Sequence, residues 1–366
     1  MSDIVISGYY GFRNSGDDAL LMSIINDLKA KKPGVDVVVL SKNPVETKSV
    51  YNVRAVRREN IFGVIKEIRN AKMLISGGGT LIQDGTSTKS LLYYLAIIKI
   101  AQMFKKRIML YANGMGPLYS KKNRERVKKV LNNADIITLR DEDALKEIEA
   151  LGIKKPYIEV TADPAFSLPV ARSEKDLGVL PGIQGCEKMM LVSVREWKEL
   201  RSDFEKVVAD ACDYAFEKYG LYTVFLPMQP QRDGEITEKI RKLMKNKSTV
   251  ISGSYTIEQQ LSIIGSMSLC VGMRLHSLIY SAAMCVPQIG IAYDPKINGF
   301  LDYIESNSYF ECSTLTVKDI TDEIDNCVQN YDSIKENLLK KREELRAKAD
   351  RNAVLAVELL ERRTDK

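Results

Sequence analysis

The residues best suited to chemistry lie in one stretch, 272–298, which contains His276, the only histidine among 366 residues. His276 follows Arg274 by two residues, just after the apolar run 269–271, and the apolar spacing from Leu275 onward predicts a helix. A cation and a histidine at such a strand-to-helix junction suit anion binding and proton transfer, because the ordinary pKa of histidine is about 6.5. We therefore interpret His276 as a proton-transfer residue; the alternative is a hydrogen-bonded structural histidine.

A second cation follows the next expected strand. The run 286–291 is mostly apolar and is expected to be a buried strand, and the turn 293–296 after it presents Lys296. In an open parallel sheet the carboxyl ends of the strands form the edge where ligands bind, and a helix beginning there adds exposed N–H donors. We expect Arg274, His276 and Lys296 to converge on one cleft at this edge.

The first half of the chain begins with a glycine-rich loop. A strand is expected at 4–7, and the glycine spacing of the loop 8–18 differs from the dinucleotide fingerprint G-x-G-x-x-G. Glycines let the backbone of such a loop approach a ligand closely. Capping of the next helix is the alternative role, and we expect at least one of three residues only to cap it: Ser15, Asp17 and Asp18.

Further loops of this kind follow the later strands of the first half. The strand expected at 73–76 ends in three glycines, among them Gly78 and Gly79. Three glycines after a buried strand suit a nest of backbone N–H groups for an anion, and a tight turn is an equally favoured alternative. Asn113 follows the next strand and Arg140 the one after it, which places both at the same carboxyl edge.

Strand and helix patterns alternate along the whole chain, which predicts an α/β protein with two Rossmann-like parallel-sheet domains facing a cleft. This is a glycosyltransferase-B-like architecture. We expect an N-terminal domain at 1–168, a linker at 169–188 and a C-terminal domain at 189–331. The remaining segment, 332–366, predicts a long C-terminal helix that packs back on the first domain.

The composition is that of a soluble globular protein, with 45% hydrophobic and 28% charged residues. No signal peptide is visible, and the apolar runs are shorter than the ~20 residues that span a bilayer, so we expect a cytoplasmic protein. The six cysteines form no C-x-x-C pair, which indicates neither a zinc site nor a disulfide framework.

The net charge of +6 favours anionic partners, and no nucleic-acid-binding motif is present. Basic residues concentrate at 105–107, 121–122 and 124–129. Such runs are usually solvated helix faces, and the alternative is contact with an anionic membrane surface. A peripheral position on the inner face of the membrane would follow from the second interpretation.

The motifs, taken in order, resemble one known family. They are GYYGFRNSGDDA at 8–19, SGGGTLIQD at 76–84, NGMGP at 113–117, LRD at 139–141, SVR at 193–195 and GMRLH at 272–276. The chain resembles the polysaccharide pyruvyl transferases, and within them the bacterial cell-wall type, from Gly8 to about Phe300. The pair Arg274 and His276, together with Arg140, is the most specific part of the resemblance.

The resemblance implies a phosphoenolpyruvate-dependent transferase. Family members move the enolpyruvyl part of phosphoenolpyruvate onto a sugar and leave a cyclic pyruvate ketal plus phosphate. In the cell-wall branch the acceptor is N-acetylmannosamine in a polyprenyl-diphosphate-linked precursor, and the product helps to anchor surface-layer proteins. This scheme needs no cofactor and no metal.

Candidate roles follow from that chemistry. His276 suits proton transfer, and Asp17 can accept a hydroxyl proton. Arg140 and Arg274 suit bidentate binding of the donor's anionic groups, and Lys296 supplies a point charge. The candidates for acceptor or anion binding in the loops are Asn14, Gly78, Gly79, Asn113 and Arg195.

Two other functions stay open at this stage. One is a sugar-nucleotide-dependent glycosyltransferase of the same fold, and the other is a non-catalytic glycan-binding protein. The first would turn over a nucleotide sugar and ignore phosphoenolpyruvate, and the second would bind glycan without releasing phosphate. The sequence is compatible with a homo-oligomer and does not fix the acceptor sugar.

Overall fold

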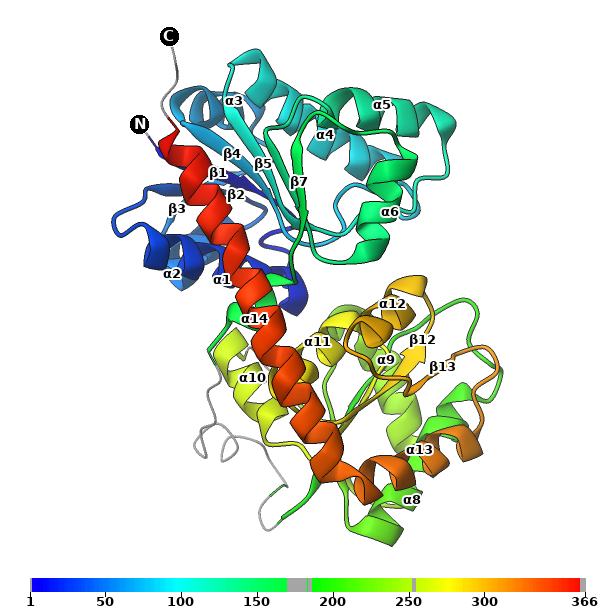
Figure 1. The fold of residues 1–366 in the computed structure, drawn as a ribbon. Helices are drawn as coiled ribbons and strands as arrows, with labels where there is room; N and C mark the ends of the chain where they lie inside the picture. The colour runs from blue at the N-terminus through cyan, green and yellow to red at the C-terminus, as the bar shows by residue number, and fades with distance from the viewer. Residues whose placement is uncertain (1, 170–182, 184–185, 252–254, 363–366) are drawn as a thin grey trace. The chain divides into compact units, whose positions relative to one another are not determined.

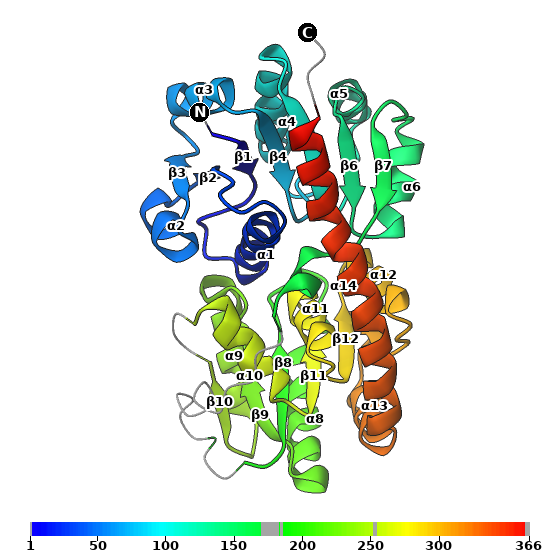
Figure 2. The ribbon, with the colours of Figure 1, turned by 60° about the vertical axis from the view of Figure 1, so that its left-hand side comes forward.

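The computed structural model describes residues 2–169, 183, 186–251 and 255–362, and the chain divides into two compact units (Figures 1 and 2). The first unit comprises Met1–Leu168 and Leu345–Lys366, and the second comprises Pro169–Glu344. Each unit contains a parallel sheet with helices on its faces. The predicted linker at 169–188 lies largely outside the described residues.

The first unit has a seven-stranded parallel sheet in the order β3-β2-β1-β4-β5-β6-β7. The strands are β1 (Ile4–Ser7), β2 (Val37–Ser41), β3 (Arg54–Arg57), β4 (Met73–Gly77), β5 (Arg107–Asn113), β6 (Ile136–Leu139) and β7 (Tyr157–Val160). The direction of the strand order reverses between β1 and β4, and ligands bind at such switch points. The sequence analysis did not identify the edge strands β3 and β7, which are short and only partly buried.

Seven helical segments from the first part of the chain cover this sheet. They are α1 (Ser15–Lys31), α2 (Pro44–Tyr51), α3 (Ile61–Asn70), α4 (Thr88–Met103), α5 (Lys121–Leu131), α6 (Glu142–Ala150) and the short 3-10 helix η1 (Pro164–Ser167). α4 contacts both α3 and α5, and their apolar faces share one core, for example through Val64, Leu91 and Val127. α1 packs on the opposite face through residues such as Ile24 and Leu28.

From Leu345 onward, the long helix α14 (Tyr331–Glu361) belongs to the first unit and packs into the core on the same face of the sheet as α1. Leu355 and Leu359 are buried with the side chains of α1 and the strands. Asn352 is fully buried and hydrogen-bonds to Thr161 Oγ1 at 2.9 Å. The C-terminal half of α14 is therefore an integral part of the first unit's core.

The second unit has a six-stranded parallel sheet in the order β10-β9-β8-β11-β12-β13. The strands are β8 (Met189–Ser193), β9 (Tyr222–Phe225), β10 (Ser248–Val250), β11 (Leu269–Gly272), β12 (Gln288–Ala292) and β13 (Tyr309–Glu311). Its helices are α8 (Phe204–Tyr219), α9 (Pro230–Leu243), α10 (Ile257–Gly265), α11 (Leu275–Ala283), α12 (Pro295–Tyr303) and α13 (Val317–Gln329). The strand order reverses between β8 and β11.

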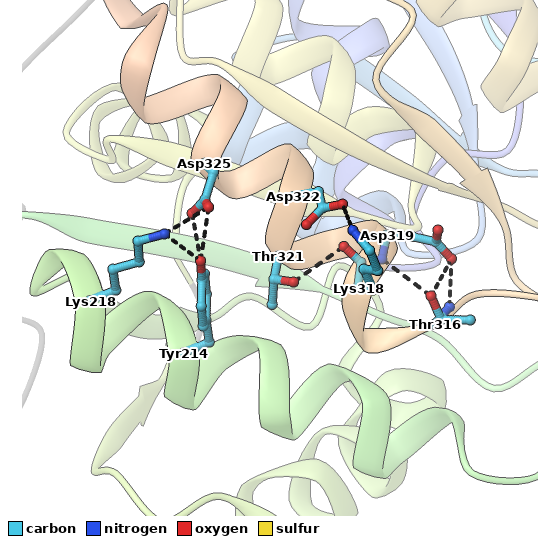
Figure 3. A network of polar contacts seen from close by, with 8 residues as sticks. All are labelled: Tyr214, Lys218, Thr316, Lys318, Asp319, Thr321, Asp322 and Asp325. Carbon is cyan, nitrogen blue, oxygen red and sulfur yellow. Dashed lines mark hydrogen bonds and ion pairs between the residues drawn. The ribbon is translucent and has the colours of Figure 1, made fainter.

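A polar network fixes α13 beside α8 (Figure 3). Asp325 on α13 accepts hydrogen bonds from Tyr214 at 2.8 Å and from Lys218 at 2.7 Å, both on α8. Thr316 and Asp319 form a reciprocal capping box that starts α13. This surface network fixes α13 against α8, and it includes none of the predicted site residues.

The predicted fold class is confirmed by this architecture, and two local predictions need correction. Helix α9, which begins at Pro230, was not predicted from the sequence. The sequence analysis also expected Lys296 in a turn, whereas Lys296 lies in the first turn of α12. In both places a proline occupies the first helical position, where its missing N–H costs nothing. Among the described helices, none is both long and apolar enough to span a bilayer.

Candidate functional site

In the first unit, Asp17 lies at the carboxyl edge of the sheet, in the first turn of α1. The cap of that helix is Asn14, whose side chain accepts a hydrogen bond from Gly16 N at 3.1 Å. Asp17 is therefore not needed as the cap. Its carboxyl faces the loop after β4, because a Cβ added at Gly79 would lie 3.2 Å from Asp17 Oδ1.

The pKa of Asp17 is raised to about 8. The largest cause is desolvation, because protein atoms surround the carboxyl even though part of the side chain is accessible. The neighbouring Asp18 and Asp163 raise the pKa further, and Arg140 lowers it. A carboxyl with such a pKa is protonated at neutral pH and ionises just above it, which is a suitable range for proton transfer.

The glycine loop after β4 is hydrogen-bonded to the end of β5. Gly78 and Gly79 adopt φ values of +63° and +73°, which favour glycine. Asn113 is fully buried, and its Nδ2 donates to Gly79 O at 3.3 Å. Its Oδ1 is buried without a hydrogen-bond partner among the described residues. Buried polar atoms without a partner are uncommon in folded proteins, so this oxygen marks Asn113 as an unusual position.

Arg140 follows β6 and is only 7% exposed. Its guanidinium donates to Thr80 Oγ1 at 3.2 Å and to Asp141 Oδ2 at 3.2 Å. A third group, the buried Asp163, lies 3.7 Å away through Oδ2 and Nη1. A Cβ added at Gly114 would lie 2.7 Å from Thr80 Oγ1 and 3.0 Å from the same guanidinium, so a larger residue there would displace this pair. Arg140 is thus an ion-paired, firmly positioned cation.

In the second unit, Arg274 is the N-cap residue of α11 and forms a two-point ion pair with Asp233 on α9. Nε donates to Oδ2 at 3.0 Å, and Nη2 donates to Oδ1. Asp233 is fully buried, and its Oδ2 also accepts Gln229 N at 2.9 Å. Nη1 of Arg274 makes no hydrogen bond with a described residue and remains able to bind an anion.

Arg195 lies two residues beyond β8, with its guanidinium against Trp197 and Tyr293, whose ring centroids are 4.8 Å apart. Its Cζ is 4.7 Å from the ring centroid of Tyr293 and 5.1 Å from that of Trp197. Nη1 donates to Tyr293 Oη at 2.8 Å, while the buried Nε has no partner among the described residues. No carboxylate within the described ranges forms an ion pair with Arg195.

Lys296 is held near the same tyrosine. Its Nζ lies 5.2 Å from the Tyr293 ring centroid and 3.2 Å from Asp294 Oδ2. Tyr293 therefore contacts both Arg195 and Lys296, which come from the ends of β8 and β12. Each of these cations thus makes a cation–π contact with the same aromatic ring at the carboxyl edge of the sheet.

His276 is the second residue of α11 and is half-buried. Its ring centroid lies 6.0 Å from that of Tyr280, one helical turn later. β11 pairs with both β8 and β12, so the loop carrying Arg274 and His276 emerges between those carrying Arg195 and Lys296. The predicted site residues of this unit thus share one edge around the switch point.

The site residues form two groups, one on each unit. Asp17, Gly79, Asn113 and Arg140 meet in the first, and the second contains Arg195, Arg274, His276 and Lys296. The prediction that both groups share one cleft stays a prediction. The sequence analysis missed the carboxylates that hold the two arginines, Asp163 and Asp233, because each pairs across a long stretch of chain. No cluster of metal-ligating side chains occurs among the described residues.

Comparisons with known proteins identify a matching family and a relative of the chain. Residues 14–295 match the sequence profile of the family described as polysaccharide pyruvyl transferase. The chain is also 20% identical to the amylovoran biosynthesis protein AmsJ of Erwinia amylovora, with 92% of this chain and 94% of that protein covered.

Solved structures show the same fold at low identity. A UDP-GlcNAc 2-epimerase from Neisseria meningitidis, bound to UDP-GlcNAc, has a TM-score of 0.66 at 10% identity, with 98% of this chain and 99% of that chain covered. A glycosyltransferase from Rickettsia africae has a TM-score of 0.64 at 11% identity, with 99% and 100% covered. The sequence profile matches more than half of the chain, and the chain therefore belongs to the polysaccharide pyruvyl transferase family.

Proposed function

We propose that this protein transfers pyruvate from phosphoenolpyruvate to a sugar, forming a cyclic ketal and releasing phosphate. The reaction adds two sugar hydroxyls to C2 of the donor. One proton is gained by the methylene carbon, which becomes a methyl group, and the other leaves with phosphate. The observation that carries the proposal is Arg195, a cation without a carboxylate partner among the described residues, set against Tyr293 beside Lys296.

The donor carries a carboxylate and a phosphate, and the second unit offers several cationic contacts for them. Arg195 and Lys296 bind one anionic group across the Tyr293 ring, and Arg274 contributes Nη1 to the other. Arg140 remains a candidate for the donor, although its charge is already balanced by Asp141 and Asp163. Buried arginines need such partners, since an unpaired buried charge is costly.

Proton transfer in this proposal uses two residues. His276 protonates the methylene carbon, which generates positive charge at C2. A sugar hydroxyl then adds to this electrophilic carbon. Asp17 accepts a hydroxyl proton once it has ionised; its pKa of about 8 makes it a stronger base than an ordinary carboxylate. Asn113 Oδ1 is a candidate contact for a second sugar hydroxyl.

The acceptor we propose is N-acetylmannosamine in a polyprenyl-diphosphate-linked cell-wall precursor, as the sequence motifs suggest. The relative AmsJ is described as an amylovoran biosynthesis protein, which supports a polysaccharide precursor in general. Supplying phosphoenolpyruvate with lipid-linked saccharides and measuring phosphate release tests the proposal. A nucleotide-sugar transferase would release no phosphate from phosphoenolpyruvate, and a glycan-binding protein would release none from any donor.

A further inference from the structure

We infer that the ends of α3, α4 and α5 at the carboxyl edge of the first unit form a docking surface for an anionic bilayer. This apolar–basic rim consists of six exposed residues: Phe62, Leu92, Tyr119, Lys89, Lys121 and Lys122. All three helices begin where a parallel strand has ended, so their first turns lie at the edge that carries Gly78 and Gly79. The inference depends on the proposed function in one respect: docking on a bilayer would bring the protein to a lipid-linked acceptor.

Large apolar side chains at the rim point into solvent. Phe62 is 86% exposed, Tyr119 is 77% exposed and Leu92 is 40% exposed. Each comes from a different helix end, so no single flexible tail explains their exposure. Aromatic side chains of this kind insert at the boundary between headgroups and acyl chains.

The three helix ends are tied together. Before α3, the Arg58 guanidinium lies 4.2 Å from the Tyr93 ring centroid on α4. Before α4, Asp84 accepts Tyr119 N at 2.7 Å and Ser120 N at 3.1 Å from the segment that starts α5. The rim therefore presents its side chains on a fixed framework.

The charge of the rim suits anionic lipid. Lys89, Lys121 and Lys122 form no ion pair with any residue in the described part of the chain. Two exposed acidic residues lie nearby; Glu59 is paired with Lys42 at 2.8 Å, and Glu125 lies on α5. Lysine is depleted at protein–protein interfaces, whereas lysines around exposed aromatic residues are typical of membrane surfaces.

The test measures sedimentation of the full chain with phosphatidylcholine vesicles, with and without phosphatidylglycerol. We expect binding to the anionic vesicles, weakened by salt, and little binding to phosphatidylcholine alone. The double variant Lys121→Glu/Lys122→Glu should bind more than tenfold more weakly, since each lysine near the surface is worth roughly fivefold. Phe62→Ser and Tyr119→Ser should each weaken binding several-fold at unchanged charge.

Matched controls come from exposed positions of the second unit. Lys198→Glu/Lys318→Glu changes the net charge equally, and Leu243→Ser removes an exposed apolar side chain; both should bind like wild type. The inference is overturned if wild type ignores anionic vesicles, if the rim variants bind like the controls, or if Phe62→Ser instead dissociates an oligomer. Vesicle binding needs no substrate, so the docking inference can be correct even if phosphoenolpyruvate proves not to be the donor.

Discussion

Arg274 and Asp233 form a two-point ion pair that joins the first turn of α11 to the first turn of α9, 41 residues apart in sequence. Asp233 is fully buried, and Arg274 is 13% exposed at the side chain. The pair fixes the direction of the remaining Nη1 group of Arg274. A positioned guanidinium loses less freedom on binding an anion than a mobile one does.

Asp233→Asn should destabilise the protein by about 3–5 kcal/mol, because it leaves the largely buried Arg274 guanidinium without its carboxylate partner. Asp233→Asn combined with Arg274→Met should recover much of that loss, since the charge is gone. Both variants should lose activity, with kcat/KM for phosphoenolpyruvate reduced at least tenfold. Chemical denaturation and steady-state kinetics measure the two effects, and a fully active double variant would remove Arg274 from the donor site.

Arg195→Gln should raise KM for phosphoenolpyruvate by roughly ten- to a hundredfold, the value of a lost charge-assisted contact of ~1.5–3 kcal/mol. Tyr293→Phe keeps the ring under the guanidinium and removes only the bond to Tyr293 Oη, so its effect should be less than about tenfold. Arg201→Gln, at a partly exposed ion pair with Asp203, is the matched control. If Arg195→Gln saturates with donor like wild type, Arg195 does not bind it.

His276→Gln should fold and bind phosphoenolpyruvate but lose ~10²–10⁴-fold in turnover, the usual contribution of general acid catalysis. Donor binding is measured by calorimetry and turnover by phosphate release. A variant whose loss of activity follows only from a lower melting temperature would make His276 structural. Tyr280→Phe, which keeps the neighbouring ring, should change turnover little.

Asp17 makes stability and activity depend on pH in opposite directions. Folding raises its pKa from 3.8 to about 8, so its contribution to stability is fully present below about pH 4 and is lost as the pH rises through about 8. Asp17→Asn should therefore become more stable relative to wild type as the pH rises from 6 to about 8, by up to about 1 kcal/mol per pH unit, with little further change above pH 8.

Wild-type activity should increase over the same range if Asp17 acts as the base, because the carboxylate form accumulates. Asp17→Asn should lack this limb of the profile and lose most turnover. An activity that instead falls as the pH rises through 8, with the fall absent in Asp17→Asn, would make Asp17 an acid. Denaturation and rate measurements at matched pH values separate these outcomes.

The sequence identified the loops at the carboxyl edges because periodic apolar runs locate strands, and parallel topology then places Asn113, Arg140 and Arg274 at their ends. It did not predict the partners of the arginines. Asp233 lies in α9, a helix that was not predicted from the sequence. The raised pKa of Asp17 could not be predicted from the sequence either, because desolvation depends on which side chains pack around the carboxyl.

Donor identity is tested most directly by incubating the purified chain with phosphoenolpyruvate and a polyprenyl-diphosphate-linked saccharide that contains N-acetylmannosamine. We expect phosphate release that requires both substrates, and an acceptor whose mass increases by one pyruvate less one water. His276→Gln should abolish both signals. Consumption of a nucleotide sugar with no phosphate released from phosphoenolpyruvate would contradict the account.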